Sequence, residues 1–258
     1  MLLDAWRLAL GTLTVVPVAP PGVIDRRRAG MAMVLAPLAA LPLAGAVTLV
    51  ALAGHGLDLP VPVAALLALG AAVLGNRAFH LDGLSDTVDG MAASYDRERS
   101  LEVMKSGTSG PAGVVAVVLV LGLQAAGLVA VLASPHPVRA VVLAGCALCV
   151  SRAALATCCT RGVPSARPAG LGDIYTRTVA RPVVGLMWLA CAAVLSLAGA
   201  WAGLAWWRGV LSVAAALAVV AVVAVVVARA VRRLGGVTGD VFGASTELAL
   251  TTLLVGLS

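Results

Sequence analysis

The sequence contains few aromatic residues and few charged ones. Aromatic side chains make up 3% of its 258 residues and charged side chains 12%, which is about half the charged share of an ordinary soluble domain. Apolar residues make up 61%, and the mean hydropathy is +1.04. This composition excludes an ordinary soluble domain and predicts an all-α fold, a polytopic helix bundle in a membrane.

The sequence also lacks the usual signals of secretion, redox chemistry and nucleic-acid binding. Its first residues form no basic cluster, and Asp4 and Arg7 interrupt the apolar run, so we predict no cleavable signal peptide. The single CxxC, Cys146 to Cys149, lies in an apolar run without a second pair, and we interpret all five cysteines as small hydrophobic side chains. The net charge of +6 comes from loop residues that orient membrane helices, so we expect no nucleic-acid partner.

A transmembrane helix needs about 20 mostly apolar residues. The segments that meet this requirement are Met31–Ala53, Val61–Phe79, Ala112–Ala133, Val138–Cys159, Val183–Trp201, Gly209–Ala228 and Val241–Leu257. We interpret Leu2–Val18 as an amphipathic helix that is shallowly inserted or re-entrant, with an eighth span as the alternative. Pro37 and Pro42 predict a bend in the first span. We expect residues 1–258 to form a single integral membrane domain.

Basic residues alternate from one connecting segment to the next. Starting before the first span, successive segments contain 3, 0, 3, 1, 4, 1 and 3 Lys or Arg residues. Because basic loops stay in the cytoplasm, this pattern predicts a cytoplasmic N-terminus and an outward-facing C-terminus. The long polar loops then face the cytoplasm, where we expect the functional site to lie. A transporter would more often carry polar residues through the middle of the bilayer, so small-solute transport is only an alternative.

Three aspartates follow the second predicted span, in the stretch FHLDGLSDTVDG. Asp82, Asp86 and Asp89 are spaced i, i+4 and i+7, which places them within about 60° on one helical face. Like charges so placed repel one another, and the cost rises at a membrane boundary. Mg²⁺ would reverse the sign of this interaction, since it binds carboxylate and phosphate oxygens. We therefore expect these aspartates to bind Mg²⁺, with a solvated helix end as the alternative.

A second acidic pair opens the last predicted span. Asp240 and Glu247 are spaced i, i+7, and a carboxylate inside a span requires a partner or a metal. His80 abuts the first aspartate, and we expect His80 and Glu247 to contact substrate; that His80 instead orients Asp82 or only marks the membrane interface is the alternative. Arg152 lies in the middle of the fourth predicted span, where we expect it to bind an anion or a carboxylate. A structurally paired arginine is the alternative.

A stretch rich in glycine and hydroxyl groups, MKSGTSGPAG, precedes the third predicted span. Free backbone N–H groups at a helix start bind phosphate well, and a lysine adds positive charge. We expect Lys105, Ser106 and Gly107 to contact a substrate phosphate, although such clusters are also ordinary loops. The acids and this loop together predict Mg²⁺-dependent phosphotransfer, in which a carboxylate takes the proton of an attacking hydroxyl.

The stretch FHLDGLSDTVDG resembles the signature of the cobalamin synthase family, the adenosylcobinamide-GDP ribazoletransferases. The stretches LTVVPV, RSLEVMK, ARPAGLG and GGVTGDVFGASTEL resemble family features in the same order. The resemblance implies a bacterial inner-membrane enzyme that joins adenosylcobinamide-GDP to α-ribazole or its 5′-phosphate. The products would be adenosylcobalamin or its 5′-phosphate and GMP, with Mg²⁺ as cofactor. It also implies that Asp82, Asp86 and Asp89 bind metal, and we assign the general base to Asp89 or Asp240.

The sequence departs from the family pattern in one place. Many relatives have Asp-Ser-Arg after the residue that matches Met104, whereas this chain reads Lys-Ser-Gly-Thr and so has no carboxylate there for a second metal. The nearest alternative is a CDP-alcohol phosphotransferase, whose pattern DxxDGxxAR fits only in its first half because Ser94 replaces the arginine. Membrane lipid is a further expected partner, and the sequence is compatible with a homo-oligomer.

Overall fold

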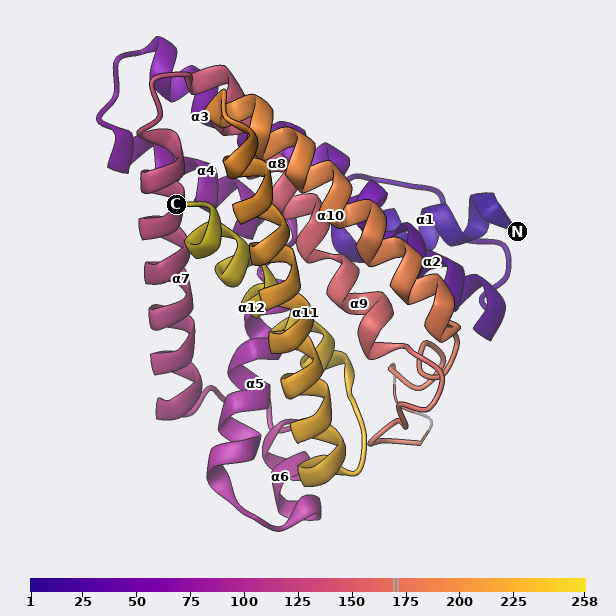
Figure 1. Ribbon diagram of the computed structural model, residues 1–258. Coiled ribbons are helices and arrows are strands. Elements are labelled where there is room, and N and C mark those ends of the chain that lie inside the picture. The colour runs from indigo at the N-terminus through magenta and orange to yellow at the C-terminus, as the bar shows by residue number, and fades with distance from the viewer. Residues whose placement is uncertain (169, 171) are drawn as a thin grey trace.

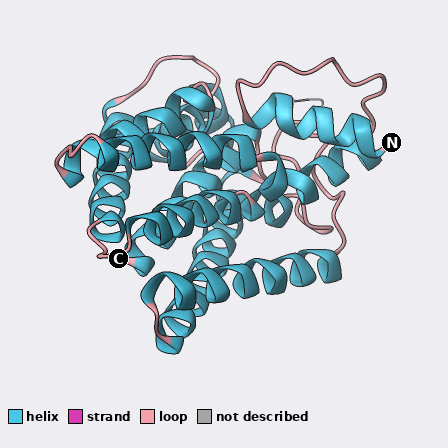
Figure 2. Cartoon of the chain, turned by 90° about the horizontal axis from the view of Figure 1, so that it is seen from above, coloured by secondary structure: helices cyan, strands magenta, loops and turns pink. Residues whose placement is uncertain are grey.

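The structure is a computed structural model, and it describes residues 1–168, 170 and 172–258. Ala169 and Leu171, which belong to the ARPAGLG stretch, lie outside the described residues. The described part of the chain is built of α-helices and contains no strand (Figure 2). The helices are α1 (Leu2–Leu13), α2 (Arg26–Ala39), α3 (Leu41–Gly56), α4 (Val61–Gly75), α5 (Phe79–Ala93), α6 (Arg97–Val103), α7 (Pro111–Leu132), α8 (Pro137–Ser151), α9 (Ala153–Cys158), α10 (Arg181–Gly203), α11 (Trp206–Leu234) and α12 (Gly239–Leu257).

Within the described residues, 6 helical segments are long and apolar enough to cross a membrane. They are α2 with α3, α7, α8 with α9, α10, α11 and α12. Counting α4 and α5 as one broken span gives 7. The prediction of a polytopic membrane helix bundle is therefore confirmed. The N-terminal helix α1 has 12 residues, which is too short to cross a bilayer, so the alternative of an eighth span is wrong.

Helix breaks divide the first two predicted spans. The first is interrupted at Ala40, where α2 ends and α3 begins, with Pro42 in the first turn of α3. The second, Val61–Phe79, is not one continuous helix: α4 ends at Gly75, and α4 with α5 forms a bent pair that is a broken span or a re-entrant loop. Arg77 and Ala78 adopt φ angles of +61° and +55°, which a right-handed helix cannot contain. The chain consequently turns by 84° between α4 and α5, so the acidic stretch forms a helix of its own.

Helix α12 lies in the middle of the bundle, where it packs against α5, α7, α8 and α11 (Figure 1). Small residues allow this close approach: a Cβ added at Gly127 of α7 would lie 2.7 Å from the backbone of Leu254 in α12. Close packing at glycine is common between membrane helices, which gain little from burying apolar surface away from lipid. The central position of α12 places Asp240 and Glu247 against the surrounding helices.

The two ends of the bundle differ in their connections. In Figure 1 the short turns α3–α4, α7–α8 and α10–α11 lie at the upper end, whereas α6 and the C-terminus of α11 lie at the lower end. The lower end also contains longer connections, including residues 94–110 and the segment that joins α9 to α10. These are the connections with many basic residues, so the predicted alternation matches two distinct ends of the molecule.

Candidate active site

The contact between α5 and α12 depends on two glycines. A Cβ added at Gly83 of α5 would lie 2.7 Å from the carbonyl oxygen of Asp240, and one added at Gly243 of α12 would lie 2.8 Å from the carbonyl oxygen of His80. Real Cβ atoms do not approach other atoms so closely, so glycine is required at both positions for this packing. The contact brings the start of α12 beside the middle of α5 and joins the two acidic stretches of the sequence.

Three carboxylates meet at this contact, and we call Asp82, Asp86 and Asp240 the acidic cluster. Asp82 is exposed, and the other two are half-buried. Asp86 lies in the electrostatic field of Asp82, Asp240 and Asp89, and Asp240 in that of Asp82. Such neighbours repel one another, most strongly where water is partly excluded. The cluster therefore carries an excess of negative charge that favours binding of a cation.

One arginine partly offsets this charge. Arg167 is the cation whose charge acts on both Asp86 and Asp240 among the described residues. Its Nη1 lies 3.7 Å from Oδ2 of Asp240, and its Nη2 donates a hydrogen bond of 2.6 Å to the carbonyl oxygen of Leu101. Thr238, the N-cap of α12, donates from Oγ1 to Oδ2 of Asp240 at 3.2 Å. Neither residue was singled out from the sequence as a site residue. Arg167 does belong to the basic loop 161–173, which the sequence suggested either covers an anionic substrate or only sets the topology.

Asp89 has a different environment from the acidic cluster. It is 6% exposed, and its two carboxylate oxygens accept hydrogen bonds from the backbone N–H groups of Gly110, at 2.7 Å, and Gly113, at 2.8 Å. Gly110 is the N-cap of α7, so the carboxylate stabilises this helix start. The expectation that the N–H groups here are free for phosphate is wrong for these two glycines, because Asp89 already accepts their hydrogen bonds.

The predicted phosphate-binding loop is exposed. Lys105, Ser106 and Gly107 all lie at the surface, on the connection between α6 and α7. Ser106 donates from Oγ to the carbonyl oxygen of Val103 at 2.8 Å, and Gly107 adopts a φ of +69° that favours glycine. The structure thus links this loop to the site through Asp89 and the start of α7, while Lys105 has no ion-pair partner among the described residues.

The carboxylates are better suited to a metal ion that binds together with the substrate than to one that the protein holds permanently. No group of three or more His, Cys, Asp or Glu among the described residues could hold a metal ion alone. Mg²⁺ in phosphate-handling sites usually takes one or two carboxylates, with the remaining ligands from water and substrate phosphates. Asp82 and Asp86 supply oxygens of this kind at an accessible position, so the donor set fits a Mg²⁺–diphosphate.

A second polar cluster lies deeper along the same two helices, and we call His80, Gln124, Arg152 and Glu247 the buried polar cluster. Each is at most 4% exposed. Gln124 of α7 donates from Nε2 to Oε2 of Glu247 at 2.8 Å, and Nδ1 of His80 lies 3.8 Å from Oε1. Arg152 donates from Nη1 to Oγ of Ser151 at 2.7 Å and senses the charge of Glu247. Three residues predicted to contact substrate are thus brought together away from solvent.

Gln124 was missed by the sequence reasoning, although a signal was present. It is the only amide, acid or base in the helix PAGVVAVVLVLGLQAAGLVAVL, and a polar residue in an apolar span usually has a polar partner. Three polar atoms in the buried polar cluster have no hydrogen-bond partner in the described part of the chain: Nδ1 of His80, Oε1 of Gln124 and Nε of Arg152.

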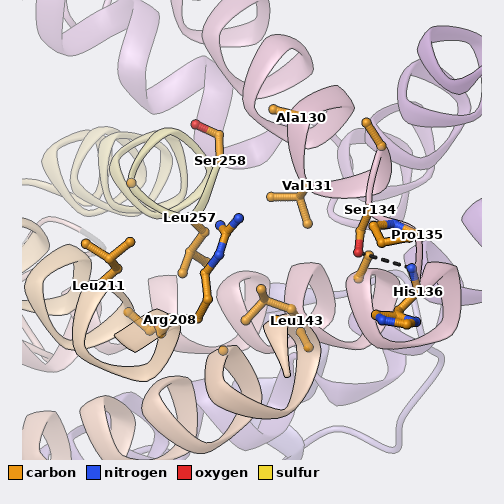
Figure 3. Close-up of a pocket in the computed structure, with 17 residues that line it drawn as sticks. Ala130, Val131, Ser134, Pro135, His136, Leu143, Arg208, Leu211, Leu257 and Ser258 are labelled. Carbon is orange, nitrogen blue, oxygen red and sulfur yellow. Dashed lines mark hydrogen bonds between the residues drawn. The ribbon is translucent and has the colours of Figure 1, made fainter. Parts of the chain in front are cut away.

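A pocket of about 370 Å³ lies at the opposite end of the bundle (Figure 3). The ends of α7 and α12 and the starts of α8 and α11 form it, and His136, Arg208 and Ser134 line it together with apolar side chains. Its described lining contains no Asp or Glu side chain. It therefore lacks the carboxylates that phosphotransfer with Mg²⁺ needs, and the α5–α12 contact is the better candidate for the active site.

Comparisons with known proteins found similarity over nearly the whole chain. A family model described as cobalamin-5-phosphate synthase matches residues 5–258. A protein of Nocardioides sp. (strain ATCC BAA-499 / JS614) named adenosylcobinamide-GDP ribazoletransferase is 51% identical over 253 residues, which cover 98% of this chain and 97% of that protein. One with the same name from Frankia casuarinae is 35% identical over 266 residues, covering 99% of this chain and 94% of that protein. No solved structure matches the chain.

Proposed function

Because the chain belongs to the cobalamin-5-phosphate synthase family, we propose that it is an adenosylcobinamide-GDP ribazoletransferase. It joins adenosylcobinamide-GDP to α-ribazole or its 5′-phosphate and releases GMP. The observation that locates the proposed activity in the molecule is the acidic cluster. There, three carboxylates and one arginine lie at the accessible end of the α5–α12 contact. Full-length similarity to proteins with this name removes the support for the CDP-alcohol phosphotransferase and transporter alternatives.

The roles of the residues follow from their exposure and partners. Asp82 and Asp86 would hold Mg²⁺, which when bound supplies neutralisation of the charge on the diphosphate oxygens. Asp240 is half-buried, and only one of its oxygens, Oδ2, contacts Thr238 and Arg167, so we assign it as general base for the attacking ribose hydroxyl. Asp89 is a poorer base because both its oxygens accept backbone hydrogen bonds.

The remaining residues bind and orient. Arg167 lies close to Asp240, so its guanidinium group would bind a phosphate oxygen of a substrate held at the acidic cluster. Guanidinium groups bind phosphates well. Asp89 fixes the start of α7, and with it the exposed connection that contains Lys105. The buried polar cluster lies at the other end of the α5–α12 contact from solvent, so its members hold the helices in place around the acidic cluster, and His80 also lines a neighbouring pocket.

We further propose that the acidic cluster faces the cytoplasm of a bacterial cell, at the inner membrane. The segments on either side of the cluster, between α5 and α7 and between α9 and α10, belong to the basic-rich set. Basic segments near membrane helices stay in the cytoplasm. A scan with a membrane-impermeant thiol reagent on single cysteines at residues 95–105 should give labelling only after the membrane is opened; labelling of intact spheroplasts would invert this orientation.

The proposed function is tested with the purified protein in lipid nanodiscs. Incubation with adenosylcobinamide-GDP, α-ribazole and Mg²⁺ should give adenosylcobalamin and an equal amount of GMP, measured by chromatography of the corrinoid and nucleotide products. Excess EDTA should stop the reaction, and added Mg²⁺ should restore it. Absence of any corrinoid product from correctly folded protein would refute the proposed function, whereas a rate that EDTA leaves unchanged would refute only the role of the metal.

A further inference from the structure

An aromatic pocket lies beside the acidic cluster. It has a volume of about 490 Å³ and is lined by Phe79, Phe242 and Tyr175, with Leu13 and Leu155 among its apolar residues. The chain has only 2 Phe and 2 Tyr in all, so both phenylalanines and one tyrosine gather at this single pocket. Tyr175 and Phe242 pack edge to face, with ring centroids 6.5 Å apart. Such a concentration in a chain poor in aromatic residues indicates a flat apolar ligand.

Residues that line the pocket lie next to the acidic cluster on the same two helices, α5 and α12. On α12, Gly239, Phe242 and Gly243 line the pocket, and Asp240 is the next residue after the first of these. On α5, Phe79 and His80 line the pocket, less than one helical turn before Asp82. These lining residues are thus sequence neighbours of the acidic cluster on both helices, although no carboxylate of the cluster is among the described residues that line the pocket itself.

The loop between α9 and α10 contributes residues both to the pocket and to the surroundings of the acidic cluster. Tyr175, Gly170 and Gly172 of the loop line the pocket, and Arg167 earlier in the same loop lies 3.7 Å from Asp240. A Cβ added at Gly172 would lie 3.0 Å from the backbone nitrogen of Gly239, so the loop backbone rests directly on the start of α12. One segment thus contributes both an aromatic wall to the pocket and a cation to the acidic cluster.

We propose that the aromatic pocket binds the base of the acceptor nucleoside, so that Phe242 and Tyr175 determine acceptor specificity; this inference rests on the proposed function. The base of α-ribazole is a dimethylbenzimidazole, which is flat, apolar and has few groups that need hydrogen bonds. Guanine, the base of the other substrate, has several polar edge groups that would lose hydrogen bonds in such a pocket. Thr12 and His80 are among the few polar side chains in the lining, so the pocket selects the apolar base.

The first test varies the ligand and leaves the protein unchanged. Binding of α-ribazole to the full chain in phosphatidylethanolamine–phosphatidylglycerol nanodiscs is measured by equilibrium dialysis without Mg²⁺ or corrinoid. An α-riboside with adenine in place of the dimethylbenzimidazole should bind about tenfold more weakly or worse, because its polar edge stays unpaired. Guanosine should not displace α-ribazole. Equal affinity for the two ribosides, or displacement by guanosine, would overturn the inference, as would displacement of α-ribazole by added phospholipid.

The second test varies the protein. Phe242→Ala and Tyr175→Ala should each raise the KM for α-ribazole about tenfold and leave the KM for adenosylcobinamide-GDP unchanged, since each removes an aromatic contact of the base alone. Phe242→Leu and Tyr175→Phe keep the apolar volume or the ring and should stay within about threefold of the wild type. Tyr95→Ala is the matched control, because Tyr95 is 91% exposed and lies outside the pocket.

The outcomes separate the inference from the proposed function. A wild-type protein that forms cobalamin while the alanine variants raise both KM values equally, or neither, would contradict the aromatic pocket as acceptor site and leave the function intact. A wild-type protein that binds α-ribazole but forms no cobalamin would contradict the function. If Phe242→Ala does not fold, Tyr175→Ala and the comparison of ribosides decide the question.

Discussion

The acidic cluster and the buried polar cluster both lie along the α5–α12 contact, the latter with Gln124 of α7 and Arg152 at the end of α8, but they differ in exposure and in charge balance. Asp82, Asp86 and Asp240 are exposed or half-buried and share one arginine. The buried polar cluster contains one carboxylate, Glu247, and one guanidinium, Arg152, whose charges act on each other away from solvent without forming a direct salt bridge in the described part of the chain. An accessible excess of like charge is suited to binding a cation that arrives with substrate, whereas a balanced buried pair is suited to fixing helices in place.

The largest expected effect comes from breaking the balanced cluster. Glu247→Gln keeps an amide oxygen that can accept the hydrogen bond from Gln124 but leaves the buried Arg152 without its counter-charge, which should cost about 3–5 kcal/mol of stability. Thermal unfolding in nanodiscs measures this loss. The double variant Glu247→Gln with Arg152→Met removes the uncompensated charge and should be more stable than Glu247→Gln alone. A double variant as unstable as the sum of its single variants would show that the two charges do not interact.

The next effect comes from the acidic cluster and should fall on activity alone. Asp82→Asn should lower kcat/KM about 100-fold or more, because one carboxylate that would hold the Mg²⁺ on the diphosphate is lost, while the unfolding temperature stays the same or rises as repulsion is relieved. Asp58→Asn is the control, since Asp58 is an exposed aspartate in the turn between α3 and α4. An Asp82→Asn protein that turns over normally would remove Asp82 from the site.

Asp89 is buried, like the buried polar cluster, but it follows the two acidic-cluster residues of α5. Its substitution should affect the start of α7. Asparagine supplies only one acceptor oxygen where Asp89 accepts from both Gly110 and Gly113, so Asp89→Asn should cost about 1–3 kcal/mol. Faster proteolysis of the connection before α7 would report the loss locally. Asp96→Asn offers a matched control: Asp96 caps the exposed helix α6, where asparagine caps equally well. An unchanged protease pattern in Asp89→Asn would contradict the anchoring role.

An effect of similar size on stability should come from the helix contact that joins the clusters. The methyl group of Gly83→Ala would meet the carbonyl oxygen of Asp240 at 2.7 Å, so α5 and α12 must separate slightly, at a cost of about 1–3 kcal/mol. Activity should fall several-fold through displacement of the carboxylates. At Gly70 a Cβ would meet nothing within 4 Å, and Gly70→Ala should be neutral or slightly stabilising. Equal behaviour of the two alanine variants would argue against a tight contact at Gly83.

The sequence predicted the spans and the acidic residues because both depend on local composition. Runs of about 20 apolar residues have few other fates, and Asp82 and Asp86 stand out against them. The break before α5 was missed, since the residues that adopt left-handed φ angles are Arg77 and Ala78, although Gly75 and Asn76 directly before them are residues that commonly end a helix. Spacing on one helix suggested three equivalent aspartates, but only the fold shows that Asp89 also accepts hydrogen bonds from Gly110 and Gly113.

Long-range contacts also explain what was missed. The sequence indicated that Glu247 and Arg152 needed partners, but it could not indicate that they lie near each other or that Gln124 of α7 donates to Glu247. Likewise, Arg167 looked like one basic loop residue among several until the fold placed it 3.7 Å from Asp240. Pairings between residues so far apart in the chain depend on the packing of the whole bundle, which composition and periodicity do not specify.

Binding of the substrate diphosphate to the acidic cluster through Mg²⁺ can be measured as equilibrium binding of adenosylcobinamide-GDP. Without α-ribazole no turnover occurs, so affinity is measured by itself, with Mg²⁺ or with EDTA, for the wild type and for Asp82→Asn. Mg²⁺ should strengthen binding to the wild type about tenfold or more and leave binding to Asp82→Asn almost unchanged. Equal affinity in EDTA, or a full Mg²⁺ effect in Asp82→Asn, would contradict this mode of binding.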